Sequence, residues 1–198
     1  RLAKASAERA RMTEEKKRKP HLISYYEQNE LRRIPEIIAL LKAGNNVALV
    51  SDAGTPTISD PGFKLVRECI LHGIKIESIP GPSSILAALT VSGLPTDKFL
   101  FLGYPPKKEG HRKKLFQSLS SMVQTIKPTV IIFEAPHRLL KTLEELHEVF
   151  GDIDIVICRE LTKLHEEIRR EKISESIVHF HKVTSKGEFV ILFHPDTI

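Results

Sequence analysis

Apolar residues recur along this chain with two spacings, one typical of helices and one typical of buried strands. Between residues 31 and 43, isoleucine and leucine return every three or four positions, which places them on one face of a helix. Short continuous apolar runs are typical of strands buried on both faces. The helical spacing predicts helices at residues 31–43, 61–72, 84–92, 115–126, 136–150 and 174–181. The apolar runs predict strands at residues 47–50, 74–79, 99–104, 130–133, 155–158 and 189–193.

The predicted strands and helices alternate along most of the chain. Such alternation predicts an α/β protein whose central strands are mostly parallel. A break near residues 94–98 indicates two lobes, residues 21–97 and residues 98–198, preceded by a basic helix or arm at residues 1–20. Ligands of open α/β sheets bind beyond the carboxyl ends of the strands. The loops that follow strands are therefore the first places to look for a site.

The loop at residues 51–62 reads Ser-Asp-Ala-Gly-Thr-Pro-Thr-Ile-Ser-Asp-Pro-Gly and follows a predicted strand. A connection of this length without regular structure is uncommon unless it is functional. Its glycine and prolines allow backbone amides to approach a carboxylate, and an acidic side chain can meet an ammonium or sulfonium group. Asp60 precedes a proline, and we expect it to cap the next helix. The sequence predicts ligand binding at Asp52, Ala53, Gly54, Thr55 and Pro56.

Four other loops next to strands carry polar residues. Residues 80–84, Pro-Gly-Pro-Ser-Ser, form a stiff turn whose serines can bind a ligand or cap a helix, and local chemistry favours capping. Glu134 lies directly after a strand, where it can act on a ligand or form a surface ion pair with Arg138. Residues 159–162 and 186–188 are weaker candidates when each is taken alone.

The composition is that of an ordinary globular protein, with 41% hydrophobic and 28% charged residues. The net charge of +5 is carried by residues 1–20, and a second basic cluster follows the strand at residues 99–104. Clustered positive charge favours a polyanionic partner, although a solvated surface would give the same composition. The second cluster consists of Lys107, Lys108, Arg112, Lys113 and Lys114.

Several classes of protein find no support in the sequence. No apolar run approaches the roughly 18 residues that span a bilayer, and the charged first twenty residues do not resemble a secretory signal. Cys69 and Cys158 stand alone in apolar stretches, so we expect two buried thiols rather than disulfides or a zinc site. No P-loop or dinucleotide fingerprint is present, and the scattered histidines predict no metal.

Taken together, the loops resemble the motifs of the tetrapyrrole (corrin/porphyrin) methylase superfamily. Residues 51–62 resemble its signature loop, and residues 80–89 resemble its second motif. Phe-Glu-Ala-Pro-His-Arg-Leu at residues 133–139 resembles the Glu-x-Pro-His-Arg motif of the small-subunit ribosomal RNA methyltransferase I family within it. That family usually has serine in place of Ala135. Further matches to the same family lie at residues 22–30, 103–108, 159–163 and 186–189.

The resemblance implies a two-lobed α/β fold that binds S-adenosylmethionine between its lobes and uses no metal. It also implies methylation of the ribose 2′-hydroxyl of a cytidine in small-subunit ribosomal RNA, by a homodimer in the cytoplasm or in an organelle. Residues 2–20 match the family poorly, and the family's opening strand is not found. The first lobe is therefore expected to be incomplete.

The resemblance also gives each candidate residue an expected role. Glu134 is expected to act as the base, or as an electrostatic group beside the sulfonium. The residues expected to bind the cofactor are Asp52, Ala53, Gly54, Thr55, Pro56, Ser83, Ser84, Glu160, Leu161 and Gly187. The residues expected to contact the RNA backbone are Lys107, Lys108, Arg112, Lys113, Lys114 and Arg138.

Two other functions are compatible with the sequence. One is a methyltransferase of the same superfamily that acts on a corrinoid or porphyrin precursor, against which the basic run at residues 107–114 and the motif at residues 133–139 argue. The other is a non-catalytic RNA-binding assembly factor, which the basic residues 1–20 favour. Affinity for S-adenosylmethionine would separate the second alternative from an enzyme.

Overall fold

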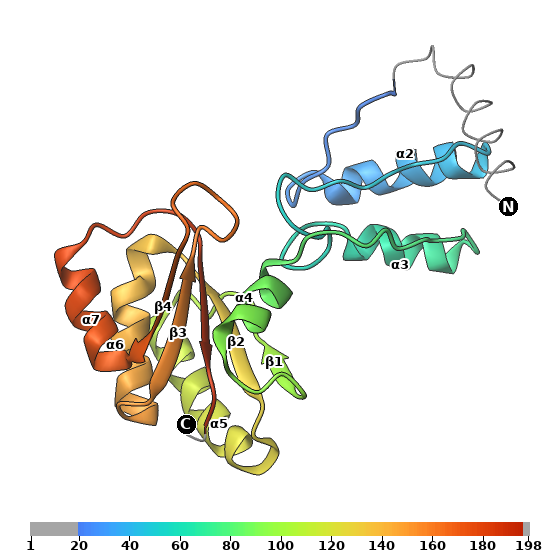
Figure 1. The fold of residues 1–198 in the computed structure, drawn as a ribbon. Coiled ribbons are helices and arrows are strands. Elements are labelled where there is room, and N and C mark those ends of the chain that lie inside the picture. Colours follow the sequence, from blue (N-terminus) through green and yellow to red (C-terminus); the bar gives the residue numbers. More distant parts are fainter. Residues whose placement is uncertain (1–19, 196–198) are drawn as a thin grey trace, which may run out of the picture. The chain divides into compact units, whose positions relative to one another are not determined.

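The computed structural model of the chain describes residues 20–195 (Figure 1). Apart from Pro20, the basic segment predicted at residues 1–20 lies outside the described residues. The helices are α2 (Glu30–Lys42), α3 (Phe63–Leu71), α4 (Ser84–Ser92), α5 (Glu109–Ile126), the 3-10 helix η1 (Pro136–Arg138), α6 (Leu139–Phe150) and α7 (Ile173–Lys182). The strands are β1 (Phe99–Phe101), β2 (Thr129–Glu134), β3 (Asp154–Arg159), β4 (Glu167–Lys172) and β5 (Phe189–Phe193).

The helices lie where the apolar spacing predicts them, and local capping chemistry sets several of their ends. The side chain of Ser83 accepts a hydrogen bond from the Leu86 amide at 3.5 Å, so the predicted cap of α4 is confirmed. Gly93 ends the same helix with a φ of 79°, and Gly151 ends α6 with a φ of 77°. Glycine is favoured at such positions because it has no Cβ to clash there. None of the helices among residues 20–195 is both long and apolar enough to cross a membrane.

The described chain divides into two compact units. The first unit comprises residues 20–48 and 61–76 and contains α2 and α3. The second comprises residues 49–60 and 77–195 and contains the sheet and the other helices. The lobe boundary expected between residues 97 and 98 stays a prediction. In the structure, α4 precedes this point and packs on the sheet that follows it.

The second unit is built on a five-stranded sheet with the strand order β1-β2-β5-β3-β4. The α/β class is therefore confirmed. Within this sheet, β1 and β2 are parallel, whereas the other three pairings are antiparallel, so the prediction of mostly parallel strands is wrong here. β3 and β4 are joined by a short loop, which can connect only antiparallel neighbours. β5 enters between β2 and β3 and runs against both of them.

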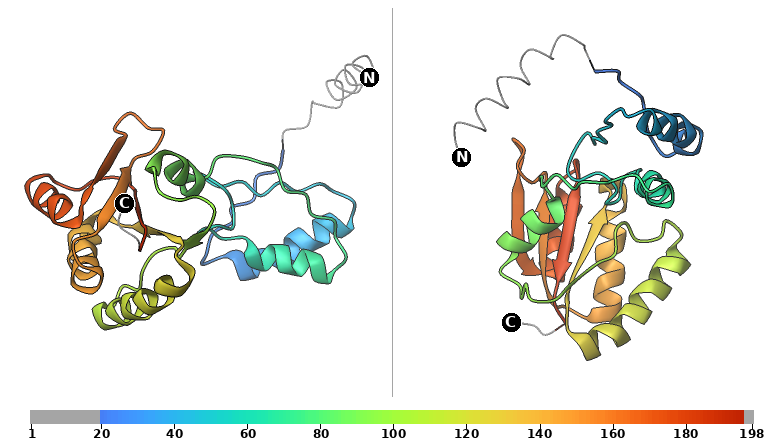
Figure 2. Two further views of the ribbon diagram at one scale, coloured as in Figure 1. Left: turned by 60° about the horizontal axis from the view of Figure 1, so that its bottom comes forward. Right: turned by 90° about the vertical axis from the view of Figure 1, so that its right-hand side faces the viewer.

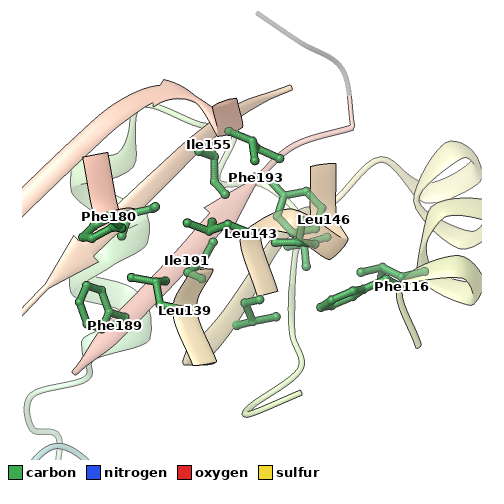
Figure 3. Close-up of a cluster of buried hydrophobic side chains, with 14 of the residues drawn as sticks. Phe116, Leu139, Leu143, Leu146, Ile155, Phe180, Phe189, Ile191 and Phe193 are labelled. Atoms are coloured by element: carbon green, nitrogen blue, oxygen red, sulfur yellow. The ribbon is translucent and has the colours of Figure 1, made fainter. Parts of the chain in front are cut away.

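β5 is the central strand, and all five of its residues are buried. Phe189, Ile191 and Phe193 belong to the larger apolar cluster, on the face covered by α5, α6 and α7 (Figure 3). Val190 and Leu192 point to the other face, which α4 covers. Figure 2 shows these helices on opposite sides of the sheet. Burial on both faces explains why β5 reads as an uninterrupted apolar run.

The apolar pattern misses β4, because its sequence, Glu-Ile-Arg-Arg-Glu-Lys, is almost wholly charged. β4 lies at an edge of the sheet, where charged side chains discourage pairing with other chains. Arg169 pairs with Glu171 at 2.6 Å and with Glu167 at 3.3 Å along the strand. Arg170 donates to the carbonyls of Val91 and Ser92, and so holds the last turn of α4.

The first unit is held together by apolar contacts between α2 and α3. An ion pair between Lys64 of α3 and Glu30 of α2 joins the same two helices. The buried apolar residues of this cluster are Ile34, Ile37, Ile38, Leu65 and Cys69. The helical stripe predicted for residues 31–43 is therefore the face that α2 buries.

The strands predicted at residues 47–50 and 74–79 are wrong, because both segments lack strand structure. The side chains of Val50 and Ile79 are each 81% exposed. An apolar run becomes a strand only where a neighbouring strand takes its amide and carbonyl groups. Neither segment has such a neighbour among the described residues.

Candidate functional site

A cavity of about 320 Å³ lies in the second unit, at one end of the strands of the sheet. β1 and β2 are parallel, and β3 runs in the same direction because β5 is antiparallel to both β2 and β3. The carboxyl ends of β1, β2 and β3 and the amino end of β5 therefore lie at the same end of the sheet. That arrangement brings the loop before β5 to the loops that follow the other strands. The lining residues come from the loops at 51–62, 80–84, 160–166 and 186–188, the ends of β2, β3 and β5, the start of α4, and Tyr104.

The loop at residues 51–62 is held in a strained shape and tied to the second loop. Thr57 and Ser59 have φ angles of 75° and 56°, a left-handed region that non-glycine residues adopt at a cost of about 1–3 kcal/mol each. The Thr55 hydroxyl donates to the Pro82 carbonyl at 2.8 Å. Of the residues predicted here to bind the cofactor, Ala53, Gly54 and Thr55 line the cavity, whereas Asp52 and Pro56 do not.

Asp60 does not cap a helix as predicted. α3 begins at Phe63 with Gly62 in the capping position, and no side chain accepts a capping hydrogen bond there. Asp60 lines the cavity instead. The Asp-Pro pair favoured capping locally, but the helix begins two residues later than predicted. Asp60 is therefore a site residue that sequence reasoning missed, although it lies within the motif at residues 51–62.

The serines of the second loop combine both of the roles considered for them. Ser83 caps α4, and Ser83 and Ser84 both line the cavity. The exposed amides at the amino end of a helix favour a negatively charged group. Because Arg170 fixes the opposite end of α4, this helix terminus is held in place by the edge strand.

Glu134 is buried among hydrogen-bond donors at the end of β2. Its side chain is 1% exposed and does not line the cavity. Its Oε1 accepts from the Ala135 amide at 2.8 Å and from Arg138 Nε at 2.7 Å. Its Oε2 accepts from the Thr142 hydroxyl at 2.6 Å. These bonds fix the turn between β2 and η1, and the catalytic role of Glu134 stays a prediction.

The two arginines expected to bind RNA both have glutamate partners within the protein. Arg112 is 3% exposed and pairs with Glu145 through two hydrogen bonds of 2.5 and 2.7 Å. Arg138 pairs with Glu134 and donates to the Pro105 carbonyl at 3.1 Å. An RNA phosphate would compete with the glutamate partners of both arginines, and the RNA contacts of Arg112 and Arg138 stay predictions. The ion pair with Glu145 is accompanied by a raised pKa of Arg112.

The lysines of the same cluster are more accessible. Lys107, Lys108 and Lys114 are exposed, and none of them has an ion-pair partner among the described residues. Lys113 pairs with Glu148 at 2.9 Å, and the hydrogen bond to this carboxylate raises the pKa of Lys113. The surface charge available to a polyanion is therefore mainly that of the three unpaired lysines.

Hydrogen bonds join the loop that follows β3 to the loop that precedes β5. Glu160 has a φ of 48°, and its carboxylate accepts from the Glu188 amide at 2.9 Å and from Lys163 at 3.1 Å. These bonds lower the pKa of Glu160. A Cβ on Gly187 would lie 2.5 Å from Glu160 Cγ, so this glycine is required by Glu160. Leu161 lines the cavity, whereas Glu160 and Gly187 shape the loops behind it.

Tyr104 and Cys158 also line the cavity, and sequence reasoning missed both. The Tyr104 ring packs edge-on against Phe133, with ring centroids 5.6 Å apart. Burial raises the pKa of Cys158 to about 11, so it stays a protonated, weakly reactive thiol. The motif at residues 103–108 indicated the position of Tyr104 but not its role. Among the described residues, no group of three or more His, Cys, Asp or Glu could hold a metal ion.

A family model described as Tetrapyrrole (Corrin/Porphyrin) Methylases matches residues 1–176. The chain belongs to this family. Ribosomal RNA small subunit methyltransferase I of Thermotoga maritima is 46% identical over 174 residues, which cover 88% of this chain and 76% of that protein. The protein of the same name from Synechocystis is 46% identical over 86% of this chain, which spans 60% of that relative. The chain therefore falls within the ribosomal RNA small subunit methyltransferase I branch of the tetrapyrrole methylases, as the motifs indicated.

Solved structures of tetrapyrrole methylases share the fold at low sequence identity. The methyltransferase CobJ superposes with a TM-score of 0.61 at 18% identity, over 83% of this chain and 71% of that chain. A uroporphyrin-III C-methyltransferase from Thermus thermophilus, complexed with S-adenyl homocysteine, superposes with a TM-score of 0.55 at 17% identity, over 87% of this chain and 77% of that chain.

Replacing Glu134 by Gln tests its positioning role. We expect Glu134→Gln to lower the free energy of unfolding by about 1–3 kcal/mol, because the partly buried Arg138 loses its charged partner. Urea unfolding would measure this change, with Glu148→Gln as the control, because Glu148 is an exposed partner of Lys113. Unchanged stability together with a loss of methyl transfer would instead indicate that Glu134 acts in catalysis.

Proposed function

We propose that the chain is an S-adenosylmethionine-dependent methyltransferase that acts on small-subunit ribosomal RNA. The observation that carries this proposal is that family-specific loops far apart in the sequence line one cavity. The similarity to proteins named Ribosomal RNA small subunit methyltransferase I, at 46% and 44% identity in two relatives, supports the choice of substrate.

The cavity suits the methyl donor in size and in chemistry. Its volume of about 320 Å³ lies within the range of small-molecule pockets, roughly 300–1,000 Å³. Apolar side chains such as Ile58 and Ile85 can cover a nucleoside, while backbone and hydroxyl groups at the start of α4 suit the amino-acid end. When bound, S-adenosylmethionine supplies a methyl group on a positively charged sulfur. We assign its binding to Ala53, Gly54, Thr55, Ser83, Ser84 and Leu161, with Asp52, Pro56, Glu160 and Gly187 shaping the loops.

The acceptor we propose is the ribose 2′-hydroxyl of a cytidine, and Asp60 is the group that takes its proton. A hydroxyl must lose a proton as it attacks, and a nearby base lowers the barrier. Asp60 and Glu188 are the carboxylates that line the cavity in the described chain. Glu188 pairs with Lys163 at 3.0 Å, whereas Asp60 has no hydrogen bond or ion pair among the described residues. Asp60 is therefore the better proton acceptor.

Lys107, Lys108 and Lys114 are the residues we assign to the RNA backbone, since they are exposed and unpaired among the described residues. Lys113 contributes when it releases Glu148. Phosphate contacts of this kind position the RNA and make its binding depend on salt. We place the reaction in the cytoplasm, with the small ribosomal subunit or its RNA as the partner.

We also propose that the chain acts as a homodimer. Phe63, Ile70 and Leu71 of α3 are apolar and largely exposed. Exposed apolar groups on one element favour burial against another protein surface. A second copy of the chain is the partner that the family resemblance implies.

Methyl transfer tests the substrate. With S-adenosylmethionine labelled in its methyl group, we expect label to enter the RNA of small subunits from a bacterium that lacks this modification. Nuclease digestion of the RNA should release 2′-O-methylcytidine. Labelling of a porphyrin precursor instead would assign the chain to tetrapyrrole chemistry. Donor binding without transfer to either substrate would contradict the enzyme proposal.

The Asp60→Asn variant tests the proton acceptor. We expect kcat for RNA methylation to fall by about 10²–10⁴-fold, with little change in the Kd for S-adenosylhomocysteine. Glu188→Gln, which alters the other cavity carboxylate, should have a smaller effect on kcat. A larger loss in Glu188→Gln than in Asp60→Asn would move the role to Glu188.

Light scattering during size-exclusion chromatography tests the oligomer. We expect a mass twice that of the chain, and a shift to the monomer mass for Ile70→Glu, because a charge there would lose its hydration in an interface. Thr90→Glu, on an exposed position of α4, should leave the mass unchanged. A monomeric protein at all concentrations would overturn the dimer.

A further inference from the structure

Residues 103–108, called the strap below, connect β1 to α5 and are fixed along their length. The Gly103 carbonyl accepts from the Phe133 amide at 2.9 Å, which joins the strap to β2. At the other end, the Lys108 carbonyl accepts from the amide of Arg112 at 3.0 Å, inside the first turn of α5. Two consecutive prolines, Pro105 and Pro106, restrict the backbone between these points. The strap therefore holds one conformation before any ligand binds.

The buried Arg112 and the partly buried Arg138 hold the middle of the strap. Arg138 donates to the Pro105 carbonyl at 3.1 Å. Arg112 donates to the carbonyls of Pro106 and Lys107, each at 3.3 Å. The partners of these arginines, Glu134 and Glu145, are 1% and 2% exposed. Hydrogen bonds to charged, buried groups are among the strongest that a protein makes, so this arrangement resists deformation.

Tyr104 is the residue that the fixed strap presents to the cavity. Its side chain is 51% exposed, and its edge-on contact with Phe133 continues to Phe101, whose ring lies 4.8 Å from that of Phe133. Burial of part of the ring, followed by the nearby Glu188 and Glu134, raises the pKa of the Tyr104 hydroxyl. The hydroxyl makes no hydrogen bond within the described residues. The ring is thus a neutral aromatic surface, supported from one side and open on another.

We propose that Tyr104 stacks on a nucleobase of the RNA acceptor and so places the target nucleotide at the cavity. This inference rests on the proposed function and adds a residue that selects the substrate. Single-stranded bases bind proteins by stacking on aromatic side chains, beside cationic groups that hold the backbone. The strap supplies both, because the exposed Lys107 and Lys108 follow Tyr104 directly. A prearranged strap also avoids the cost of ordering a loop on binding.

The alternative source of a nucleobase is the adenine of the methyl donor. Two features favour the RNA base. Tyr104 lines the cavity and is 51% exposed. The exposed Lys107 and Lys108 that follow it would attract RNA phosphates but repel the positively charged sulfonium of the donor. The test must therefore measure the binding of RNA and of donor separately.

The experiment compares Tyr104→Leu with Tyr104→Phe, which keeps the aromatic face and removes only the hydroxyl. Filter binding gives the Kd for protein-free small-subunit ribosomal RNA in the presence of S-adenosylhomocysteine, and calorimetry gives the Kd for S-adenosylhomocysteine alone. We expect Tyr104→Leu to weaken RNA binding by about tenfold or more, the effect of losing one stacked base. Tyr104→Phe should bind RNA like the natural chain. Tyr26→Leu is the control, because Tyr26 is 50% exposed and lies outside the cavity.

The outcomes separate this inference from the proposed function. Unchanged RNA binding in Tyr104→Leu, or equal weakening in Tyr104→Phe, would overturn the stacking role. An equal loss of affinity for S-adenosylhomocysteine would assign Tyr104 to the donor adenine and also overturn it. A natural chain that binds RNA without methylating it would contradict the enzyme, while the Kd values would still decide the role of Tyr104. A natural chain that does not bind the RNA would overturn both proposals.

Discussion

The cavity exists because β5 inserts between β2 and β3 in the opposite direction. This strand is buried on both faces, so its side chains belong to both apolar clusters of the second unit. Its direction brings the loop that precedes it to the edge where three other strands end. Loops from widely separated parts of the sequence therefore share one cavity, and each can keep its own irregular shape because the sheet behind them is rigid.

The charged residues of the motif at residues 133–139 hold the loops around the site in place. Glu134 accepts hydrogen bonds from Arg138 and from the Ala135 amide in the turn after β2. Arg138 also donates to the Pro105 carbonyl of the strap. In the first turn of α5, Arg112 likewise pairs with Glu145 of α6 and donates to the Lys107 carbonyl of the strap. Buried ion pairs contribute little net stability compared with apolar packing, but they specify geometry. The charged pair of this motif therefore fixes the turn after β2 and its contact with the strap.

Backbone strain is concentrated in two loops of the cavity. Thr57 and Ser59 in one, and Glu160 and Thr162 in the other, have positive φ angles. Residues other than glycine adopt such angles where the surroundings impose them, often at sites of function. In the loop after β3, the carboxylate of Glu160 bridges to the Glu188 amide and thereby offsets part of this cost. The strain and the hydrogen bonds together fix the walls that a ligand would meet.

The sequence by itself determined the helices, the central strands and the family, because apolar spacing, glycine and serine at helix ends, and motif residues are local properties. It also located the loops of the site, including Gly54, Thr55 and Ser83. Only the tertiary structure decided strand direction, the charged edge strand β4 and the fate of the apolar runs at residues 47–50 and 74–79, because these depend on a neighbouring strand. It alone separated Glu134 and Arg112, which are buried in pairs, from Asp60 and Tyr104, which reach the cavity. A side chain's partners come from distant segments, and no local pattern specifies them.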